Sequence, residues 1–348
     1  MKNLTIAVVG ATGAVGVEFL RIMEQRHAGL PNLKLLASSR SAGKRMTVGG
    51  RELVVEETTD DSFEGVDVAF ISASSEVSRR FAPIAVAAGA VVIDDGSAFR
   101  MEENVPLVVP EVNGADVEWH EGIISIPNCS TTPLVMVAHP LNQAAKIVRI
   151  VADTYQSVSG AGGSLIQELR DQSRNLLDGD ASSMPPANQR VAFNVIPQID
   201  RFQPSGYTFE EQKMIQETRK IMHCPGMALS ATCVRVPVYV SHSAAVHIEF
   251  ERPMSPEEAR ELLEAMPGVK VVDDTDRGIY PMPCDAEGTD DVLVGRVRQD
   301  ASHPNGLVLW VVADNLRKGA ALNSIQIAEE LVTRHCLKPR GKSGAVGA

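Results

Sequence analysis

The chain has 348 residues, of which 44% are apolar, 4% aromatic and 22% charged, and its formal net charge at pH 7 is −11. At roughly 100–200 residues per domain, this length predicts two globular domains. The acidic balance and the lack of a long basic run argue against binding to nucleic acid or to an anionic membrane, and the scarcity of aromatic residues argues against a platform for stacked bases.

Cysteine usage and the N-terminus indicate the compartment. The five cysteines have spacings that match neither CxxC zinc sites nor a disulfide framework: Cys129, Cys224, Cys233, Cys284 and Cys336. We therefore expect a reduced, cytoplasmic protein that holds no metal. The N-terminal apolar run breaks at Gly10, which is typical of a first strand rather than of a signal peptide, and no stretch reaches the ~18 apolar residues that span a membrane.

The first predicted elements form a nucleotide-binding turn. Leu4 to Val9 is an apolar run typical of a buried parallel strand, and residues 17–24 have helical spacing. Between them stands GATGAVG, with Gly10, Gly13 and Gly16. Glycines in this context let the backbone turn tightly and bring a pyrophosphate onto the helix N-terminus. The spacing is GxxGxxG rather than GxGxxG, so a plain tight turn is the alternative.

The next predicted strand, residues 33–37, bears on the choice of cofactor. In an NAD site an acid usually ends this strand and binds the ribose 2′-hydroxyl. Here the strand is followed by Ser38 to Lys44, which contains hydroxyls, Arg40 and Lys44. Such groups suit a 2′-phosphate, so we expect NADP; a solvated basic turn is the alternative.

Further strands and a helix continue the same pattern. Strands are predicted over residues 66–72 and 90–94, with a helix over residues 76–88. The alternation predicts a doubly wound parallel sheet, with the polar loop at Ser72 facing the cofactor at the carboxyl ends of the strands. A loop from Asp94 to Arg100 follows.

Cys129 stands between a predicted strand, residues 123–126, and a predicted helix, residues 130–143, in the stretch SIPNCSTTP. Ser130 or one of the next two threonines can cap this helix, and Pro133 suits its first turn. A cysteine at a helix N-terminus favours the reactive thiolate, and the N–H groups there can hold an oxyanion. The residues thus favour a nucleophile over the alternative, an inert buried cysteine.

The second half has a different pattern. The predicted strands cover residues 147–158, 231–240, 244–251, 292–297 and 307–313, and the predicted helices cover residues 164–177, 208–222 and 321–335. The strands before and after Ser241 alternate like a pair joined by a short connection. We expect a mainly antiparallel or mixed sheet in a separate α+β domain.

Polar residues of this half each allow two interpretations. Arg235 lies in an apolar strand and either binds a carboxylate or reaches an edge. His242 is either a general acid–base or a hydrogen-bonded structural histidine. Glu210 and Lys213 share one helix face, as site residues or as a surface pair.

Taken together, these motifs resemble the aspartate-β-semialdehyde dehydrogenase family, in its shorter bacterial form. The resemblance covers nearly the whole chain through GATGAVG, SSRSAGK, IDDGSAFR, PNCSTTP, YQSVSGAG, EEQKM, CVRVPV, SHS and DNLRKGAALN. It implies a discontinuous Rossmann-type NADP-binding domain, residues 1–128 plus about 317–337. It also implies an α+β catalytic and dimerisation domain, residues 129–316, and a homodimer or homotetramer. We expect residues 338–348 to be a disordered tail.

The resemblance also implies roles for single residues. Cys129 would be the nucleophile, His242 the acid–base, and Gln156 a residue that orients the substrate. Arg235 would bind the substrate α-carboxylate, and Glu210, or the neighbouring Glu211, its α-amine. The remaining implied contacts are to phosphate, from Arg100, Asn128 and Lys213, and to NADP, from Gly10, Thr12, Gly13, Ala14, Val15, Ser39, Arg40, Ser41, Ser72, Ser159, Gly160 and Asn315.

The implied reaction fits these residue types. The Cys129 thiolate attacks β-aspartyl phosphate, phosphate leaves, and hydride from NADPH converts the thioester into aspartate β-semialdehyde. The alternatives are a related reductase of the N-acetylglutamyl-phosphate type, which needs no acid at Glu210, and a non-catalytic NADP-binding homologue. A short-chain dehydrogenase is excluded because no tyrosine is followed four residues later by a lysine.

Overall fold

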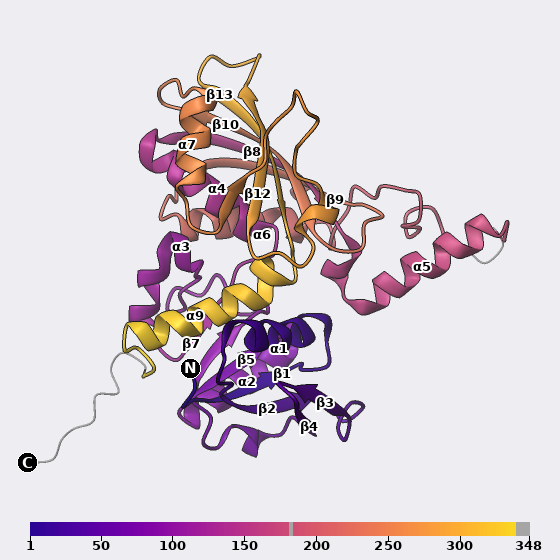
Figure 1. Cartoon of the computed structure of the whole chain (residues 1–348), viewed down its shortest axis with the longest axis vertical. Helices are drawn as coiled ribbons and strands as arrows, with labels where there is room; N and C mark the ends of the chain where they lie inside the picture. Colours follow the sequence, from indigo (N-terminus) through magenta and orange to yellow (C-terminus); the bar gives the residue numbers. More distant parts are fainter. Residues whose placement is uncertain (181–183, 339–348) are drawn as a thin grey trace, which may run out of the picture. The chain divides into compact units, whose positions relative to one another are not determined.

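The computed structural model describes residues 1–180 and 184–338. These residues form two compact units (Figure 1): Met1–Pro127 joined by the C-terminal segment that begins at Ala320, and Asn128–Gly319. The tail expected over residues 338–348 lies outside the described residues except for Lys338, and residues 181–183 lie outside them as well.

The first unit contains one seven-stranded sheet and the helices around it. Its elements in chain order are β1 (Thr5–Val9), α1 (Ala14–Arg26), β2 (Asn32–Ala37), β3 (Arg45–Val48), β4 (Arg51–Glu57), η1 (Asp60–Phe63), β5 (Val68–Ile71), α2 (Ser75–Ala87), β6 (Val91–Asp94), α3 (Pro110–Asn113), η2 (Gly114–Trp119), β7 (Ile123–Ser125) and, from the C-terminal segment, α9 (Leu322–Thr333).

The strand order is β3-β4-β2-β1-β5-β6-β7. Six of these strands run parallel, and only β3 is antiparallel to its neighbour β4. Counted along the chain, the parallel strands follow the order 3-2-1-4-5-6 of a doubly wound dinucleotide fold. The predicted doubly wound sheet is confirmed, while the β3–β4 hairpin was not predicted from the sequence.

Both faces of this sheet are covered, because each central strand is apolar on both sides. On β1, Ile6 and Val8 belong to one buried cluster together with residues of α1 and α9. Ala7 and Val9 belong to a second cluster with residues of α2 and η1. Such two-sided burial explains the continuous apolar run that marks this strand in the sequence. The C-terminal helix α9 thus completes the core of the N-terminal unit (Figure 1).

The second unit is built on a six-stranded mixed sheet. Its elements in chain order are α4 (Thr131–Ala144), β8 (Ile147–Gln156), η3 (Val158–Ala161), α5 (Gly163–Leu177), α6 (Phe209–Ile221), β9 (Ala228–Arg235), β10 (His242–Phe250), α7 (Pro256–Glu264), β11 (Val269–Val271), α8 (Pro283–Ala286), β12 (Val292–Gln299) and β13 (Gly306–Ala313). A π-helical segment, η4 (Arg317–Ala321), follows β13.

The sheet order is β11-β12-β13-β10-β8-β9. β8 is antiparallel to β10 and parallel to β9, so the mixed sheet that the sequence predicts is confirmed. The expectation that β9 and β10 pair with each other is wrong, because β8 lies between them. Pro237 falls in the segment that joins the two strands, and Ser241 there has a positive φ of 73°; this segment carries the chain across β8 instead of closing a hairpin.

Helices α4 and α6 pack against each other, and α6 also packs on β9. Helix α6 begins with a capping box, in which the Thr208 hydroxyl accepts from the Glu211 N–H while the Glu211 carboxylate accepts from the Thr208 N–H. Met214, Thr218 and Ile221 are buried at helical spacing. This packing fixes the helix from which Glu210 and Lys213 project.

No helix among the described residues is both long and apolar enough to cross a membrane.

Candidate active site

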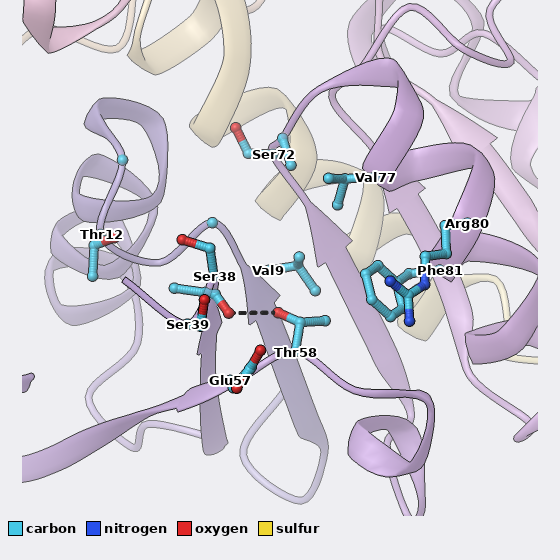
Figure 2. A pocket seen from close by; sticks show the side chains of 14 residues that line it. Val9, Thr12, Ser38, Ser39, Glu57, Thr58, Ser72, Val77, Arg80 and Phe81 are labelled. Atoms are coloured by element: carbon cyan, nitrogen blue, oxygen red, sulfur yellow. Dashed lines mark hydrogen bonds between the residues drawn. The ribbon is translucent and has the colours of Figure 1, made fainter. Parts of the chain in front are cut away.

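The first unit contains a cavity of about 440 Å³ at the carboxyl ends of its parallel strands. Figure 2 shows Ser38, Ser39 and Glu57 on one side of it, with Arg80 and Phe81 of α2 across from them. The cavity lies where ligands bind in open α/β sheets, outside the strand ends. Its lining is polar at the glycine turn and combines Val77 and Phe81 with Arg80 at α2, which suits a nucleotide with phosphates and a base.

The glycines of GATGAVG are required by close backbone contacts. Gly10 has a φ of +88°, and a Cβ there would lie 2.1 Å from the carbonyl oxygen of Ser72. A Cβ on Gly16 would lie 2.3 Å from the carbonyl oxygen of Gly10. Gly13 is the N-cap of α1 and supplies no side-chain cap, so the first N–H groups of α1 are left for a ligand. This arrangement can hold a pyrophosphate at the helix N-terminus.

Five of the residues expected to bind the cofactor line this cavity: Gly10, Thr12, Gly13, Ser39 and Ser72. Four others do not contribute to its lining, namely Ala14, Val15, Arg40 and Ser41. The turn that follows β2 extends toward solvent, and Arg40 on it is exposed.

An acid stands beside the end of β2 although none is present in the sequence that follows this strand. Glu57 of β4 is the register partner of Ala37, the last residue of β2, and it lines the cavity. The adjacent Thr58 hydroxyl donates to the Ala37 carbonyl oxygen at 3.1 Å (Figure 2). Glu57 was not predicted as a cofactor contact, because sequence order does not show which strands are neighbours in a sheet.

Arg100 also belongs to the first unit, where its own loop holds it. Its Nε donates to the Gly96 carbonyl oxygen at 3.1 Å, and its Nη2 donates to the Asp95 carbonyl oxygen at 2.9 Å. Burial raises the pKa of the Asp95 carboxyl, although the Ser72 hydroxyl that donates to it at 2.7 Å and the charge of Arg100 oppose this rise. The guanidinium of Arg100 is therefore held in one orientation by backbone carbonyls.

In the second unit, Asn128 organises the turn that carries Cys129. Its carbonyl oxygen accepts from the Thr131 N–H at 2.8 Å, and its side-chain Oδ1 accepts from the Ser130 N–H at 2.9 Å and from the Cys129 thiol at 3.4 Å. Of the three hydroxyl residues that the sequence offered as caps of α4, Ser130 occupies the N-cap position, but its hydroxyl makes no cap bond. Asn128 instead provides acceptors for the Ser130 and Thr131 N–H groups, and Cys129 lies directly before the N-cap residue of α4.

His242, the first residue of β10, is fixed by Ser157. The Ser157 backbone N–H donates to His242 Nδ1 at 3.1 Å, and the Ser157 hydroxyl lies 3.0 Å from the same nitrogen. An N–H can only donate, so Nδ1 carries a lone pair and the neutral ring has its proton on Nε2. Burial, followed by the charge of Arg235, lowers the pKa of His242 to about 3. His242 is therefore a neutral imidazole with an Nε2–H.

Gly160 and Arg235 lie next to this imidazole. A Cβ on Gly160 would be 3.0 Å from His242 Nε2 and 3.4 Å from Arg235 Nη1, so only glycine leaves this space open. Arg235 Nη1 donates to the Ser157 carbonyl oxygen at 2.6 Å. Burial lowers the pKa of Arg235, and the charges of Cys129 and Glu210 counteract that. The guanidinium thus lies in the field of both Cys129 and Glu210.

Gln156 and Glu210 form a buried pair. The Gln156 Nε2 donates to Glu210 Oε1 at 3.1 Å, and the Thr154 hydroxyl donates to Gln156 Oε1 at 3.0 Å. Lys213 Nζ lies 3.4 Å from Glu210 Oε2 and 3.0 Å from the carboxylate of Asp200. The predicted shared face of Glu210 and Lys213 is confirmed, whereas nothing in the sequence pointed to Asp200.

The two adjacent acids of α6 differ in their partners. Glu211 accepts from the Thr208 N–H through Oε2 and from the Cys233 N–H through Oε1 at 3.0 Å, so both of its oxygens bind backbone. Glu210 instead faces Gln156 and Lys213. The two acids that the sequence left as alternatives therefore differ in their surroundings: Glu211 binds backbone N–H groups, whereas Glu210 contacts side chains.

Asn315 joins three segments of the second unit. Its Oδ1 accepts from the Ser241 N–H at 2.9 Å and from the hydroxyls of Ser157 and Ser159 at 3.2 Å and 3.0 Å. One side-chain carbonyl oxygen therefore connects the segments that carry four residues predicted to belong to the site: Ser159, Gly160, His242 and Asn315. Within residues 1–180 and 184–338, no group of three or more His, Cys, Asp or Glu side chains is arranged to hold a metal ion.

Two family models match the chain. Residues 5–120 match the model described as "Semialdehyde dehydrogenase, NAD binding domain". Residues 139–318 match the model described as "Semialdehyde dehydrogenase, dimerisation domain".

Named relatives are similar over nearly the full length. A protein of Bacillus subtilis (strain 168), called aspartate-semialdehyde dehydrogenase, is 50% identical over 338 residues, covering 95% of this chain and 98% of that protein. The crystal structure of aspartate semialdehyde dehydrogenase II complexed with ASA from Vibrio cholerae has a TM-score of 0.92 at 45% identity, covering 96% of this chain and 99% of that one. The structure of aspartate semialdehyde dehydrogenase with NADP from Candida albicans has a TM-score of 0.75 at 27% identity, covering 96% and 99%.

Proposed function

The chain belongs to the aspartate-semialdehyde dehydrogenase family, and from this premise we propose which of its residues carry out the reaction. The reaction is the reductive dephosphorylation of β-aspartyl phosphate to L-aspartate 4-semialdehyde through a cysteine acyl-thioester. It serves the biosynthesis of lysine and diaminopimelate, threonine, methionine and isoleucine.

Cys129 is the nucleophile in this proposal. Cys129 directly precedes Ser130, the N-cap residue of α4, and the positive end of the helix dipole there favours a thiolate. The thiolate attacks the acyl carbon of β-aspartyl phosphate, the carbon–oxygen bond to phosphate breaks, and a thioester remains. Cys233 is no competitor, because burial raises the pKa of its thiol and its Sγ lies 3.6 Å from the sulfur of Met214.

His242 acts as a hydrogen-bond donor to the acyl oxygen. The family resemblance implies an acid–base role for His242, and we keep it in this proposal: Nδ1 accepts from the Ser157 N–H, so the neutral ring acts through its proton on Nε2. Such a donor stabilises the alkoxide of the tetrahedral intermediate, an effect worth about 100- to 1,000-fold in kcat for one donor. When the alkoxide collapses it expels the Cys129 thiolate, and the proton consumed overall resides on the released phosphate.

The two ends of the substrate meet opposite charges. Arg235 binds the α-carboxylate, Glu210 the α-ammonium, and Gln156 orients the acyl group. Lys213, Asn128 and, from the first unit, Arg100 bind the phosphate and stabilise its charge as it leaves. The observation that supports this proposal is the buried Gln156–Glu210 pair, because a carboxylate held beside Gln156 suits an unacylated amine.

The nucleotide cavity of the first unit fits a nicotinamide dinucleotide, which supplies the hydride when bound. Gly10, Thr12, Gly13, Ser39 and Ser72 line it, and the uncapped N-terminus of α1 suits the pyrophosphate. Ala14 and Val15 are proposed to bind through the backbone of α1, and Ser159, Gly160 and Asn315 to bind the nicotinamide end.

We propose NADP as the physiological cofactor, with Arg40 and Ser41 reaching the 2′-phosphate from the exposed turn after β2. Glu57 lines the same cavity, and a carboxylate there suits the free 2′-hydroxyl of NAD. Arg40 and Glu57 therefore set the preference between the two cofactors.

We further propose a cytoplasmic homodimer or homotetramer. The match of residues 139–318 to a dimerisation domain supports the assembly. The scattered cysteines, which the structure leaves unbridged, support a reducing compartment.

The assay that tests this proposal uses aspartate semialdehyde and phosphate with NADP or NAD as oxidant. We expect turnover with the wild-type chain and none with Cys129→Ser, together with an acyl adduct on Cys129 by mass spectrometry. Turnover with an N-acetylglutamyl semialdehyde instead of aspartate semialdehyde would refute the substrate assignment. A fully active Cys129→Ser variant would refute the role of the cysteine.

A further inference from the structure

Glu217 is a buried acid on α6 to which neither the resemblance nor the reaction gives a role. Only 1% of the surface of Glu217 is exposed to solvent. Its Oε2 accepts from the backbone N–H of Asn128 at 2.7 Å, across 89 residues of sequence. A buried carboxylate is costly unless hydrogen bonds satisfy it, so its presence beside the nucleophile turn requires an explanation.

The partner of Glu217 is the residue that fixes Cys129. Asn128 accepts from Thr131 N–H through its backbone carbonyl, and from Ser130 N–H and the Cys129 thiol through Oδ1. Each of these bonds lies within the turn itself. The bond from Asn128 N–H to Glu217 differs, because it ties the turn to another helix.

That helix also carries the two residues proposed to bind the substrate. Glu210, Lys213 and Glu217 are spaced three and four residues apart, which places them along one face of α6. Over seven residues an α-helix rises roughly 10.5 Å and makes nearly two full turns. In this proposal, one rigid helix binds the substrate amine and phosphate near its start. About two helical turns further on, the same helix accepts a hydrogen bond from the segment that carries Cys129.

We propose that Glu217 is a positioning residue, which fixes the distance between the Cys129 sulfur and a substrate bound to α6. This inference rests on the proposed roles of Cys129 and Glu210. Removing the Glu217 acceptor leaves the Asn128 N–H buried without a partner and frees the turn to shift. A misplacement of about 1 Å between reacting groups can lower the rate by roughly 100-fold.

Two substitutions at Glu217 separate the acceptor from the charge. Glu217→Gln keeps an oxygen of the same reach, whereas Glu217→Met fills a similar volume without an acceptor. The matched control is Glu211→Met, because Glu211 is a buried acid on the same helix that also accepts from backbone N–H groups, at Thr208 and Cys233. All three proteins are compared with wild type by thermal unfolding.

We expect Glu217→Met to lower kcat about 100-fold while changing the KM for aspartate semialdehyde less than threefold. Glu217→Gln should keep kcat within about fivefold, and Glu211→Met should lose stability but keep kcat within about threefold. The proposal is overturned by a Glu217→Met variant with wild-type kcat. The proposal is also overturned if Glu211→Met unfolds at the same temperature as Glu217→Met and its kcat is lowered by the same factor.

A second measurement needs no substrate. Iodoacetamide alkylation, quantified on the Cys129 peptide by mass spectrometry, reports how the turn holds the thiol at the start of α4. The rate at pH 7 should fall at least tenfold in Glu217→Met and stay near wild type in the Gln and Glu211 variants. An unchanged rate in Glu217→Met refutes the positioning role. If wild type fails with aspartate semialdehyde but this pattern holds, the proposed function fails and the positioning role stands.

Discussion

Replacing Gly319 by alanine tests how closely the nucleophile turn is packed. A Cβ at Gly319 would lie 2.9 Å from Cβ and 3.1 Å from Cα of Cys129. Carbon atoms in contact prefer roughly 3.5–4.0 Å, so the turn has to move by about 0.5–1 Å. Gly319 is itself held, because its N–H donates to the Asp314 carbonyl oxygen at 3.3 Å and the Asp314 carboxylate accepts from the Leu316 N–H. We therefore expect Cys129 rather than Gly319 to shift.

The expected loss of activity exceeds the loss of stability. Overpacking costs about 1–3 kcal/mol, and alanine recovers up to about 1 kcal/mol over glycine in a helical segment. The net loss of unfolding free energy in Gly319→Ala is then about 0–2 kcal/mol. A displaced nucleophile should lower kcat by about 100-fold, equivalent to about 2.7 kcal/mol in the activation barrier.

The assay measures kcat with aspartate semialdehyde, phosphate and NADP, beside urea unfolding followed by circular dichroism. Gly226→Ala is the matched control, because no atom lies within 4 Å of a Cβ built at Gly226. It should keep wild-type kcat. If Gly319→Ala is folded and retains more than a third of wild-type kcat, the reasoning about the close contact with Cys129 is refuted.

Three further predictions concern residues whose surroundings the structure defines. Arg40→Ala should raise the KM for NADP at least tenfold more than the KM for NAD. Glu57→Gln should raise the KM for NAD more than the KM for NADP. Equal effects on both cofactors would contradict the proposed roles of Arg40 and Glu57. Glu210→Gln should lower kcat/KM for aspartate semialdehyde about 30-fold, about 2 kcal/mol, whereas Glu211→Gln should lower the unfolding temperature and leave kcat/KM within threefold; the reverse pattern would exchange their roles. His242 stays neutral in the folded chain, where its pKa is lowered to about 3, whereas the unfolded chain protonates it near pH 6.5. The unfolded state therefore binds more protons between these pH values. The free energy of unfolding should fall as pH falls from about 6.5 toward 3, by up to roughly 1.4 kcal/mol per pH unit. Urea unfolding of wild type should therefore depend more steeply on pH in that window than unfolding of His242→Gln, and parallel curves would show that the ring is protonated in the folded chain.

Much of the fold could be predicted because its signals are local. The apolar run before Gly10 and the glycine spacing after it encode a buried strand and a tight turn within a few residues. Cys129 could be placed at a helix start from Pro133 and the hydroxyl residues around it. Strand pairing could not be predicted in the same way: the two strands around Ser241 alternate like a hairpin, yet β8 separates them. Alternation reports that a strand is half-buried, not which strand lies beside it.

The sequence by itself determined the two-part organisation, the nucleotide turn and the residue types from which the substrate contacts are proposed. Only the tertiary structure distinguished the hydrogen-bond partners of Glu210 from those of Glu211 and assigned the proton of His242 to Nε2. It also placed Glu57 beside the end of β2 and showed the hydrogen bond from Asn128 to Glu217. Each of these depends on a hydrogen bond or strand contact between residues from about 20 to 89 positions apart. Local periodicity carries no information about such pairs, because packing the chain in three dimensions is what decides which buried donor meets which acceptor.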